Sequence, residues 1–416
     1  MNGQIILSKS NKSMQMIEEI KKNELISNPS EIQKICLDKL KLNPLPNIKS
    51  EYWRLSNKSK FARFLDHSNK NKESKINLPY KKASEKKIRL IIGENNSINL
   101  EEENYSIKKL REIEIVEHIK KNISNFNQDE HWSDLLNHYL SSKKNILGLN
   151  ISGNKIPPIE IFSASSPDSF NAKTLILFFE KNSKVDLLQI NLGNENSSLS
   201  QSTYFCLEEN TSVNHGVVSY GESKSNLLNS LNVIQKTKSE YSLGSLHFKF
   251  NYARFEIRIN QLDGNAKTNI NGIQITKNND QIATYTTMQF NGPNGFLDQI
   301  NKSLADDKSH AVFEGSIIVP KIAQKTDASQ LSRNLLLSRH AKIDTKPQLE
   351  IIADDVKCKH GATISQLNEE ELFYMRSRGL TLAEASKLQL SSYIQEIISS
   401  IPISKDRWDL LDKILK

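Results

Sequence analysis

The chain has 416 residues, of which 37% are hydrophobic and 25% are charged, a composition typical of a folded globular protein and unlike that of disordered or collagen-like chains. At roughly 150 residues per domain, this length predicts about two to three domains. The longest apolar runs, such as residues 174–179, are far shorter than the roughly 18 residues of a membrane-spanning helix, and the polar N-terminus does not resemble a signal peptide. We therefore expect a cytoplasmic protein with no membrane partner.

The net charge of +8, from 56 Lys and Arg and 48 Asp and Glu, is concentrated in one segment. Residues 49–89 hold 13 basic and 4 acidic side chains, so they account for the whole excess. Proteins that bind single-stranded nucleic acid interleave basic and aromatic side chains, whereas the lysines at about 66–90 stand among Asn, Ser and Pro. We interpret this stretch as a solvated basic loop and expect no nucleic-acid partner, with nucleic-acid binding as the alternative reading.

Residues 1–145 are predicted to form a helical N-terminal region that contains this loop. Apolar residues recur at helical spacing in 13–42 and again in 106–139. Between the two stretches lies an aromatic-rich segment, 51–65, which precedes the loop and is typical of a chain that docks on a larger surface.

Residues 146–365 change to a period of two and are predicted to form a β domain. The expected strands are 146–151, 159–162, 174–179, 185–192, 203–207, 213–220, 312–319 and 349–352. Between 246 and 259 the alternation continues through a slip at Ala253, which suggests a β-bulge. The pattern fits a sandwich, a barrel or a solenoid equally well, because no repeat of fixed length is evident.

Residues 366–416 return to helical spacing and carry explicit capping signals. Asn368 and Thr381 each stand three residues before a Glu, as in a capping box, and Gly379 lies between the two predicted helices. The second helix carries one apolar stripe, made of Leu390, Ile394, Ile397 and Ile401. A last short helix is expected after Ser404. The stripe needs a surface to pack on, and the pattern leaves open whether that surface is the chain's own β domain or a partner.

The motifs of common enzymes are absent from the sequence. Two glycine pairs with the spacing of a nucleotide-binding P-loop, Gly148 with Gly153 and Gly216 with Gly221, lack the Lys that follows in such a loop. A β-solenoid enzyme acting on polysaccharide would need two convergent carboxylates, and the adjacent Asp354 and Asp355 point to opposite faces of a strand. We therefore expect a non-catalytic protein and keep the polysaccharide-active enzyme as an alternative.

Cys358 and His360 form the most specific constellation of metal-ligand residue types. Residues two apart in a strand share one face, and thiolate and imidazole are ligands of zinc and iron-sulfur sites. A closed site needs about four ligands, so this pair is either half of a site that another subunit completes or a buried thiol beside a hydrogen-bonded histidine. The other cysteines, Cys36 and Cys206, are far away, and no CxxC pair occurs, which argues against a disulfide framework and for a reducing compartment.

Several stretches around this pair resemble the SufB and SufD family of iron-sulfur cluster assembly proteins. They are Leu331–Ser338, Ala341–Ile351, Ala353–Thr363 and Leu372–Gly379, continued upstream by Phe313–Gly315 and Ala323–Thr326. Within the family, residues 357–363 and the short chain are more similar to the SufD branch. The family strand that contains Asp and His has no His here, since residues 284–292 read TYTTMQFNG.

The resemblance implies a right-handed parallel β-helix core over 146–365 between helical ends, and the role of a scaffold subunit in the SUF complex. Such a subunit pairs through its β-helix with SufB and binds the ABC-type ATPase SufC through its C-terminal helices, here 366–416. ATP hydrolysis in SufC would account for the missing P-loop. The residues that carry over to the SufC contact are Leu372, Phe373, Tyr374, Arg376, Arg378 and Gly379.

The resemblance also gives the Cys358 and His360 pair a role. His360 matches the family histidine that helps to form a nascent iron-sulfur cluster at the SufB interface, and Cys358 lies beside it. Both are therefore candidate ligands of a transient cluster, with the remaining ligands supplied by SufB. No stably bound cofactor is expected on the isolated chain, which could instead form a homodimer through the same edge.

Overall fold

The computed structural model describes residues 26, 28–42, 50–65, 87–93, 99–124, 130–402 and 414. The helix expected near residues 13–20, most of the basic loop and the last helix expected after Ser404 lie outside these residues. Among the described helices, none has the length and apolar content needed to cross a membrane.

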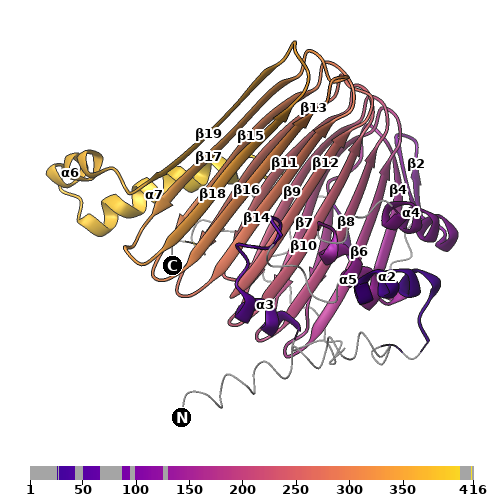
Figure 1. Ribbon diagram of the computed structural model, residues 1–416, viewed down its shortest axis with the longest axis horizontal. Coiled ribbons are helices and arrows are strands. Elements are labelled where there is room, and N and C mark those ends of the chain that lie inside the picture. Colours follow the sequence, from indigo (N-terminus) through magenta and orange to yellow (C-terminus); the bar gives the residue numbers. More distant parts are fainter. Residues whose placement is uncertain are drawn as a thin grey trace.

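Two sheets face each other and wind together into a flattened solenoid, and their strands are parallel except where β3 pairs antiparallel with β2 and β4 (Figure 1). Sheet 1 contains, in spatial order, β1 (Ile88–Ile91), β5 (Ile159–Ala164), β7 (Lys184–Gly193), β9 (Ser212–Gly221), β11 (Glu240–Phe248), β13 (Lys267–Thr276), β15 (Phe296–Ala305), β17 (Asp327–Leu336) and β19 (Lys357–Ser365). Sheet 2 contains β18 (Lys342–Ile351), β16 (His310–Val319), β14 (Gln281–Phe290), β12 (Tyr252–Gln261), β10 (Asn226–Gln235), β8 (Ser198–Leu207), β6 (Phe170–Phe179), β4 (Ile146–Gly153), β3 (Tyr105–Lys109) and β2 (Asn99–Glu102). Successive strands alternate between the sheets from β4 to β19, so the predicted parallel β-helix is confirmed.

The corners of the solenoid reveal a repeat that the sequence analysis missed. Six residues with positive φ follow one another at intervals of 14 residues, namely Asp168, Asn182, Asn196, Asn210, Lys224 and Lys238. Each is followed by a buried Ser or Thr. Five of these hydroxyls donate to the carbonyl oxygen three residues earlier at 2.6–2.9 Å, as Ser225 does to Glu222. The hydroxyl satisfies a carbonyl that the sharp turn removes from the ladders.

The bulge predicted at Ala253 is wrong, because the chain turns a corner between β11 and β12. Lys249 has a φ of 63° there, and residues 249–251 belong to neither strand. Phe248 lies on the outer face of sheet 1, Phe250 lies inside the solenoid, and Tyr252 lies on the outer face of sheet 2. Apolar residues therefore alternate across the corner although the surfaces they cover differ, and the alternation imitates one continuous strand.

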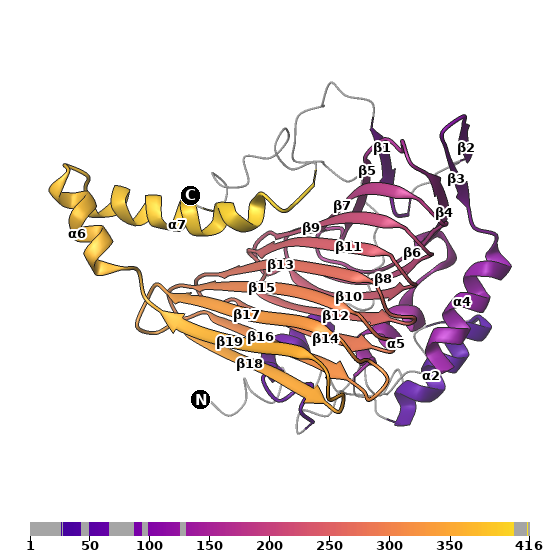
Figure 2. The ribbon, with the colours of Figure 1, turned by 90° about the horizontal axis from the view of Figure 1, so that it is seen from above.

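The N-terminal helices cover the outer face of sheet 2. They are α2 (Glu31–Leu42), α3 (Lys58–Leu65), α4 (Glu112–Ser124), α5 (Trp132–Leu140) and the short 3-10 helix η1 (Lys143–Asn145). Trp53 and Trp132 are buried against Tyr252 and Leu228 of the sheet. Strands β1 to β3, which the sequence analysis did not predict, lie between these helices in sequence and extend the two sheets (Figure 2).

The C-terminal chain forms α6 (Glu369–Ser377) and α7 (Leu382–Ile398), with the caps that the sequence predicts. The Asn368 side chain accepts bonds from the backbone N–H groups of Glu370 and Glu371, and Thr381 forms a complete capping box with Glu384. Gly379 has a φ of 98° between the two helices. Figure 2 shows α7 lying along the outer face of sheet 1 and α6 extending beyond the sheet.

The apolar stripe of α7 packs on the chain's own β domain, which resolves the alternatives left open by the pattern. Ile394, Ile397 and Ile401 are buried in one cluster with outward-facing residues of sheet 1, such as Leu246 and Phe248. The first half of the helix carries exposed apolar residues such as Leu388, so this packing holds only the second half.

Candidate functional site

The solenoid ends in two strands that have a neighbour on one side only. Among the described residues, β19 pairs with β17 alone and β18 pairs with β16 alone. Each strand therefore presents a row of backbone N–H and C=O groups that no strand takes up, which is a template for a further strand. Apolar side chains flank this edge, since Ile351, Ile352 and Ile364 have exposed fractions of 40, 68 and 46%. We call β18, β19 and these side chains the open end.

Cys358 and His360 lie on the inward face of β19, at the open end. In the parallel register, Cys358 follows Ala328 and His360 follows Gln330, and both of these β17 residues are buried inside the solenoid. Cys358 is half-buried and packs against the interior apolar cluster, whereas His360 is exposed. The two side chains share one face, as the spacing predicts, and this face is the mouth of the solenoid interior.

The chemistry of the pair is incomplete within this chain. Burial raises the pKa of the Cys358 thiol above its ordinary value, and the nearby Asp327 carboxylate adds to the shift, so the thiol stays protonated at neutral pH until a metal ion displaces the proton. No group of three or more His, Cys, Asp or Glu residues in the described part of the chain is arranged to hold a metal ion. The pair can therefore provide at most part of a ligand set.

Two buried amide side chains, Gln299 and Gln330, lie in a column beneath His360 and were not predicted from the sequence. Gln299 on β15, Gln330 on β17 and His360 on β19 are in register on the inward face of sheet 1. The Gln330 amide donates to the Gln299 carbonyl oxygen at 3.1 Å, and the Gln299 amide donates to the Thr286 hydroxyl at 2.9 Å. The signal that could have found these residues is the spacing of 30 to 31 residues between them, which is one turn of the solenoid.

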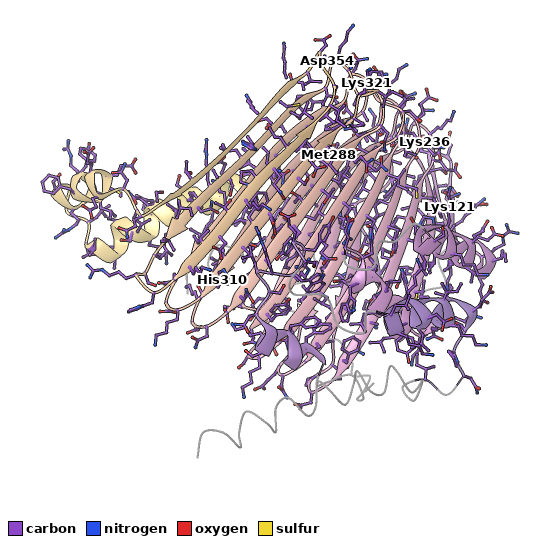
Figure 3. All side chains as sticks on the ribbon, in the orientation of Figure 1. Lys121, Lys236, Met288, His310, Lys321 and Asp354 are labelled. Atoms are coloured by element: carbon purple, nitrogen blue, oxygen red, sulfur yellow. The ribbon has the colours of Figure 1, made fainter. Side chains whose placement is uncertain are left out.

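Asp354 and Asp355 lie in the exposed corner between β18 and β19, where Figure 3 labels Asp354. This corner is no enclosed groove, and the backbone carbonyl oxygen of Asp355 accepts a bond from the Lys325 amide at 2.6 Å. His310, labelled on β16 in the same figure, donates to Asp344 at 2.7 Å and lies beside Gln281. Neither place offers the two convergent carboxylates that a polysaccharide-active enzyme needs.

The residues predicted to contact an ATPase form the surface of α6 and the turn that follows it. Phe373 and Tyr374 have exposed fractions of 73 and 58%, and Leu382 and Leu388 at the start of α7 are each 54% exposed. Leu372 is half-buried, and Arg376, Arg378 and Gly379 are exposed. We call the exposed apolar residues the α6 patch, which consists of Phe373, Tyr374, Leu380, Leu382 and Leu388.

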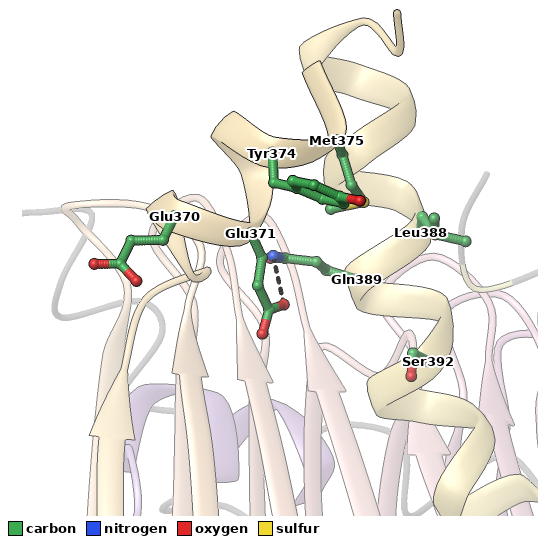
Figure 4. A pocket seen from close by; sticks show the side chains of 7 residues that line it. All are labelled: Glu370, Glu371, Tyr374, Met375, Leu388, Gln389 and Ser392. Atoms are coloured by element: carbon green, nitrogen blue, oxygen red, sulfur yellow. Dashed lines mark hydrogen bonds between the residues drawn. The ribbon is translucent and has the colours of Figure 1, made fainter. Parts of the chain in front are cut away.

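An open groove of about 450 Å³ lies between α6 and α7 beside this patch (Figure 4). Tyr374 and Met375 of α6 line one side, and Leu388 and Ser392 of α7 line the other. The Gln389 amide donates to the Glu371 carboxylate at 3.0 Å and joins the two helices across it. The apolar patch thus continues into a concave surface, a combination that marks protein-protein contact sites.

Comparison with known proteins identifies the family of the chain. A family model described as the SufBD core domain of SUF system iron-sulfur cluster assembly matches residues 162–393. The chain belongs to the SufBD family. The match includes the Cys358 and His360 pair, α6 and most of α7, so the resemblance found in the sequence is confirmed.

Individual SufBD relatives match over shorter segments. An iron-sulfur cluster assembly SufBD family protein of Synechocystis is 40% identical over 172 residues, 41% of this chain and 38% of the relative. The chloroplastic protein ABCI7 of Arabidopsis thaliana is 36% identical over 171 residues, 41% of this chain and 36% of its own length. The iron-sulfur cluster assembly protein SufD of Escherichia coli is 40% identical over 144 residues, 34% of each chain. The matched segments thus span little more than a third of these curated relatives.

Proposed function

We propose that this chain is a non-catalytic scaffold subunit of a cytoplasmic SUF complex, which pairs with SufB through its open end and binds the ATPase SufC through α6. A nascent iron-sulfur cluster is then the cargo of the complex and not a resident cofactor of the chain. The observation that carries the proposal is the position of the Cys358 and His360 pair at the mouth of a solenoid whose last strands are unpaired.

The open end supports pairing with a second β-helix. Strand addition to an unpaired edge gives affinity through main-chain hydrogen bonds, and the exposed Ile352 and Ile364 add apolar area to the contact. A partner that covers the end brings its own side chains opposite Cys358 and His360 and supplies the ligands that this chain lacks. In an isolated chain, the same surface is available to a second copy, which would give a homodimer.

The α6 patch supports binding of a second partner. Large exposed apolar patches on soluble proteins mark interaction sites, and aromatic side chains such as Phe373 and Tyr374 dominate the energy of such contacts. Arg378 lies over the Tyr374 ring at 5.3 Å, which keeps the ring on the surface beside a positive charge. Since α6 extends beyond the sheet, a partner can reach it without displacing a strand.

The second half of α7 connects the two surfaces mechanically. The Lys302 ammonium on β15 donates to the Tyr393 carbonyl oxygen at 2.8 Å and pairs with Glu396 at 2.6 Å. The Tyr393 hydroxyl donates to the Arg333 carbonyl oxygen of β17 at 2.6 Å. ATP-driven closure of SufC would move α6, and these bonds would carry the displacement into β15 and β17, next to the open end.

The experiment that tests the ATPase contact uses the purified full-length chain and SufC in size-exclusion chromatography and isothermal titration. We expect the double substitution Phe373→Ser and Tyr374→Ser to weaken binding by more than about tenfold, as loss of aromatic anchors does. Ile113→Ser on α4 is the matched control, because Ile113 is also an exposed apolar helix residue, at 55%. Equal binding by wild type and the double variant would contradict the assignment of α6.

A further inference from the structure

The inward face of sheet 1 holds a directed chain of hydrogen bonds that ends next to His360. Gln299 and Gln330 are each 1% exposed. The Gln330 amide nitrogen donates to Gln299, and the Gln299 amide nitrogen donates to Thr286, so both donors point away from the open end. The amide oxygen of Gln330 is the acceptor left at the end of this chain.

The Gln330 amide oxygen is buried and has no hydrogen-bond partner among the described residues. Buried carbonyl oxygens nearly always accept a hydrogen bond in folded proteins, so we expect a donor for this atom. The Gln330 amide packs closely against Gly315 on β16, where an added Cβ atom would collide with it, and its nitrogen is bonded to Gln299. These two contacts hold the amide inside the solenoid.

The next residue in the column is His360. Adjacent strands of a sheet are about 4.8 Å apart, and in-register residues on one face lie over each other, so His360 is the nearest side chain on the β19 side of Gln330. A ring N–H of imidazole is a donor of the kind that Gln330 lacks. Histidines that ligate metals commonly donate their second ring N–H to a carbonyl or carboxylate oxygen, which fixes the tautomer.

We infer that Gln330 is a positioning residue for His360: a rotation of the exposed His360 side chain brings the N–H of one ring nitrogen to this unpaired amide oxygen, so that the other nitrogen carries the lone pair and faces out of the open end. Gln299 and Thr286 hold the Gln330 amide in the orientation that this requires. The functional meaning of the inference rests on the proposed role of His360 in cluster formation, while the hydrogen bond itself does not.

The test is the tautomer of His360, measured in the full-length chain with ¹⁵N-labelled histidine by two-bond proton-nitrogen correlation at pH 8. The His360 signals are assigned by their loss in His360→Gln. We expect the tautomer populations in the wild type to differ from those of a solvent-exposed histidine, and Gln330→Met to shift them at least severalfold toward those of a solvent-exposed histidine. Gln330→Glu keeps an acceptor and is expected to keep the wild-type tautomer, so it provides a second test if Gln330→Met does not fold.

Asn334 provides the matched control. It lies on the same face of β17, is equally buried at 1%, and also has an amide oxygen without a partner, but its neighbour on β19 is Ile364. We expect Asn334→Leu to leave the His360 tautomer unchanged. An unchanged tautomer in Gln330→Met, or an equal change in Asn334→Leu, would overturn the inference.

Cluster formation by the co-expressed complex separates this inference from the proposed function. If Gln330 positions a cluster ligand, Gln330→Met lowers the cluster absorbance less than His360→Ala does. If the tautomer shifts in Gln330→Met while His360→Ala leaves the absorbance unchanged, the positioning bond is supported and the proposed role of His360 fails. If the tautomer does not shift, the positioning role fails whatever the absorbance shows.

Discussion

At the scale of single residues, three buried histidines and the half-buried His118 make the fold sensitive to acid. Burial lowers the pKa of His118 and His138 to about 4 and that of His215 and His247 to about 3. The unfolded chain therefore binds a proton at each of these sites below about pH 6.5, whereas the folded chain does not. Folding stability contributed by these groups is present above pH 6.5 and is lost as the pH falls toward 4.

His247 isolates this effect, because neither of its ring nitrogens has a partner among the described residues and its ring stacks on Phe255. Between pH 7 and pH 5, we expect the free energy of unfolding to fall by about 2 kcal/mol less in His247→Phe than in the wild type. Urea unfolding at both pH values measures this difference. The comparison with wild type is needed because Asp280, whose pKa burial raises to about 6, contributes in the opposite direction. An equal loss in both proteins would show that His247 is solvated.

The corner hydroxyls give a second prediction at this scale. Ser225 is fully buried, and its hydroxyl donates to the Glu222 carbonyl oxygen at 2.6 Å. Ser225→Ala removes this bond and leaves the carbonyl with the 3.0 Å bond from the Ser225 backbone N–H, so we expect a loss of about 0.5–1.5 kcal/mol in the free energy of unfolding. Ser223→Ala in the same corner removes an exposed hydroxyl and serves as the control. Equal stability of the two variants in urea unfolding would contradict a structural role for the corner hydroxyls.

At the scale of elements, the tether of α7 to sheet 1 is testable. The Lys302 side chain is 1% exposed, whereas its partner Glu396 is about half exposed, so Lys302→Met leaves a carboxylate that water can solvate. We expect the docking of α7 to weaken by about 1–3 kcal/mol. Hydrogen exchange of the α7 amides should accelerate while the β10 and β12 amides remain protected. Lys387→Met, on the exposed side of α7, is the control, and unchanged α7 exchange in Lys302→Met would refute the tether.

Local sequence signals predicted the C-terminal helices well, whereas elements that depend on long-range pairing were not predicted. The caps at Asn368, Thr381 and Gly379 were predictable because capping depends on residues within one turn of the helix. Strand β1 was not predictable, because it is short and depends on pairing with β5, some 70 residues later in the chain. The corner at Lys249 was concealed because apolar residues face three different surfaces with an unbroken alternation.

At the scale of the whole molecule, the sequence pattern could not distinguish a solenoid from a sandwich or a barrel, since all three use short alternating strands. The repeat that distinguishes them lies in the corners between residues 168 and 239, where a residue with positive φ precedes a buried Ser or Thr every 14 residues. A search for apolar periodicity does not register it. The resemblance to the SufBD family predicted the β-helix. The structure confirms the β-helix, and the family match confirms the resemblance.

The candidate site was predictable only in part, because residue spacing within one strand is visible in the sequence and the register between strands is not. A spacing of two placed Cys358 and His360 on one face, but only the register of β15, β17 and β19 places Gln299 and Gln330 beneath His360. The open end is likewise a property of the complete solenoid, because it exists only where the series of strands stops. Under the proposed function, such a site is half of an interface, and the partner would supply the rest of its chemistry.

The proposed function requires His360 to serve cluster formation at the interface with SufB. Anaerobic co-expression of this chain with SufB and SufC, followed by size exclusion and a visible absorption spectrum, tests it most directly. His340→Ala, which removes an exposed corner histidine, is the control for His360→Ala. We predict that both variants form the complex and that only His360→Ala loses the iron-sulfur absorbance. A complex with undiminished absorbance in His360→Ala, or no complex with the wild-type chain, would contradict the account.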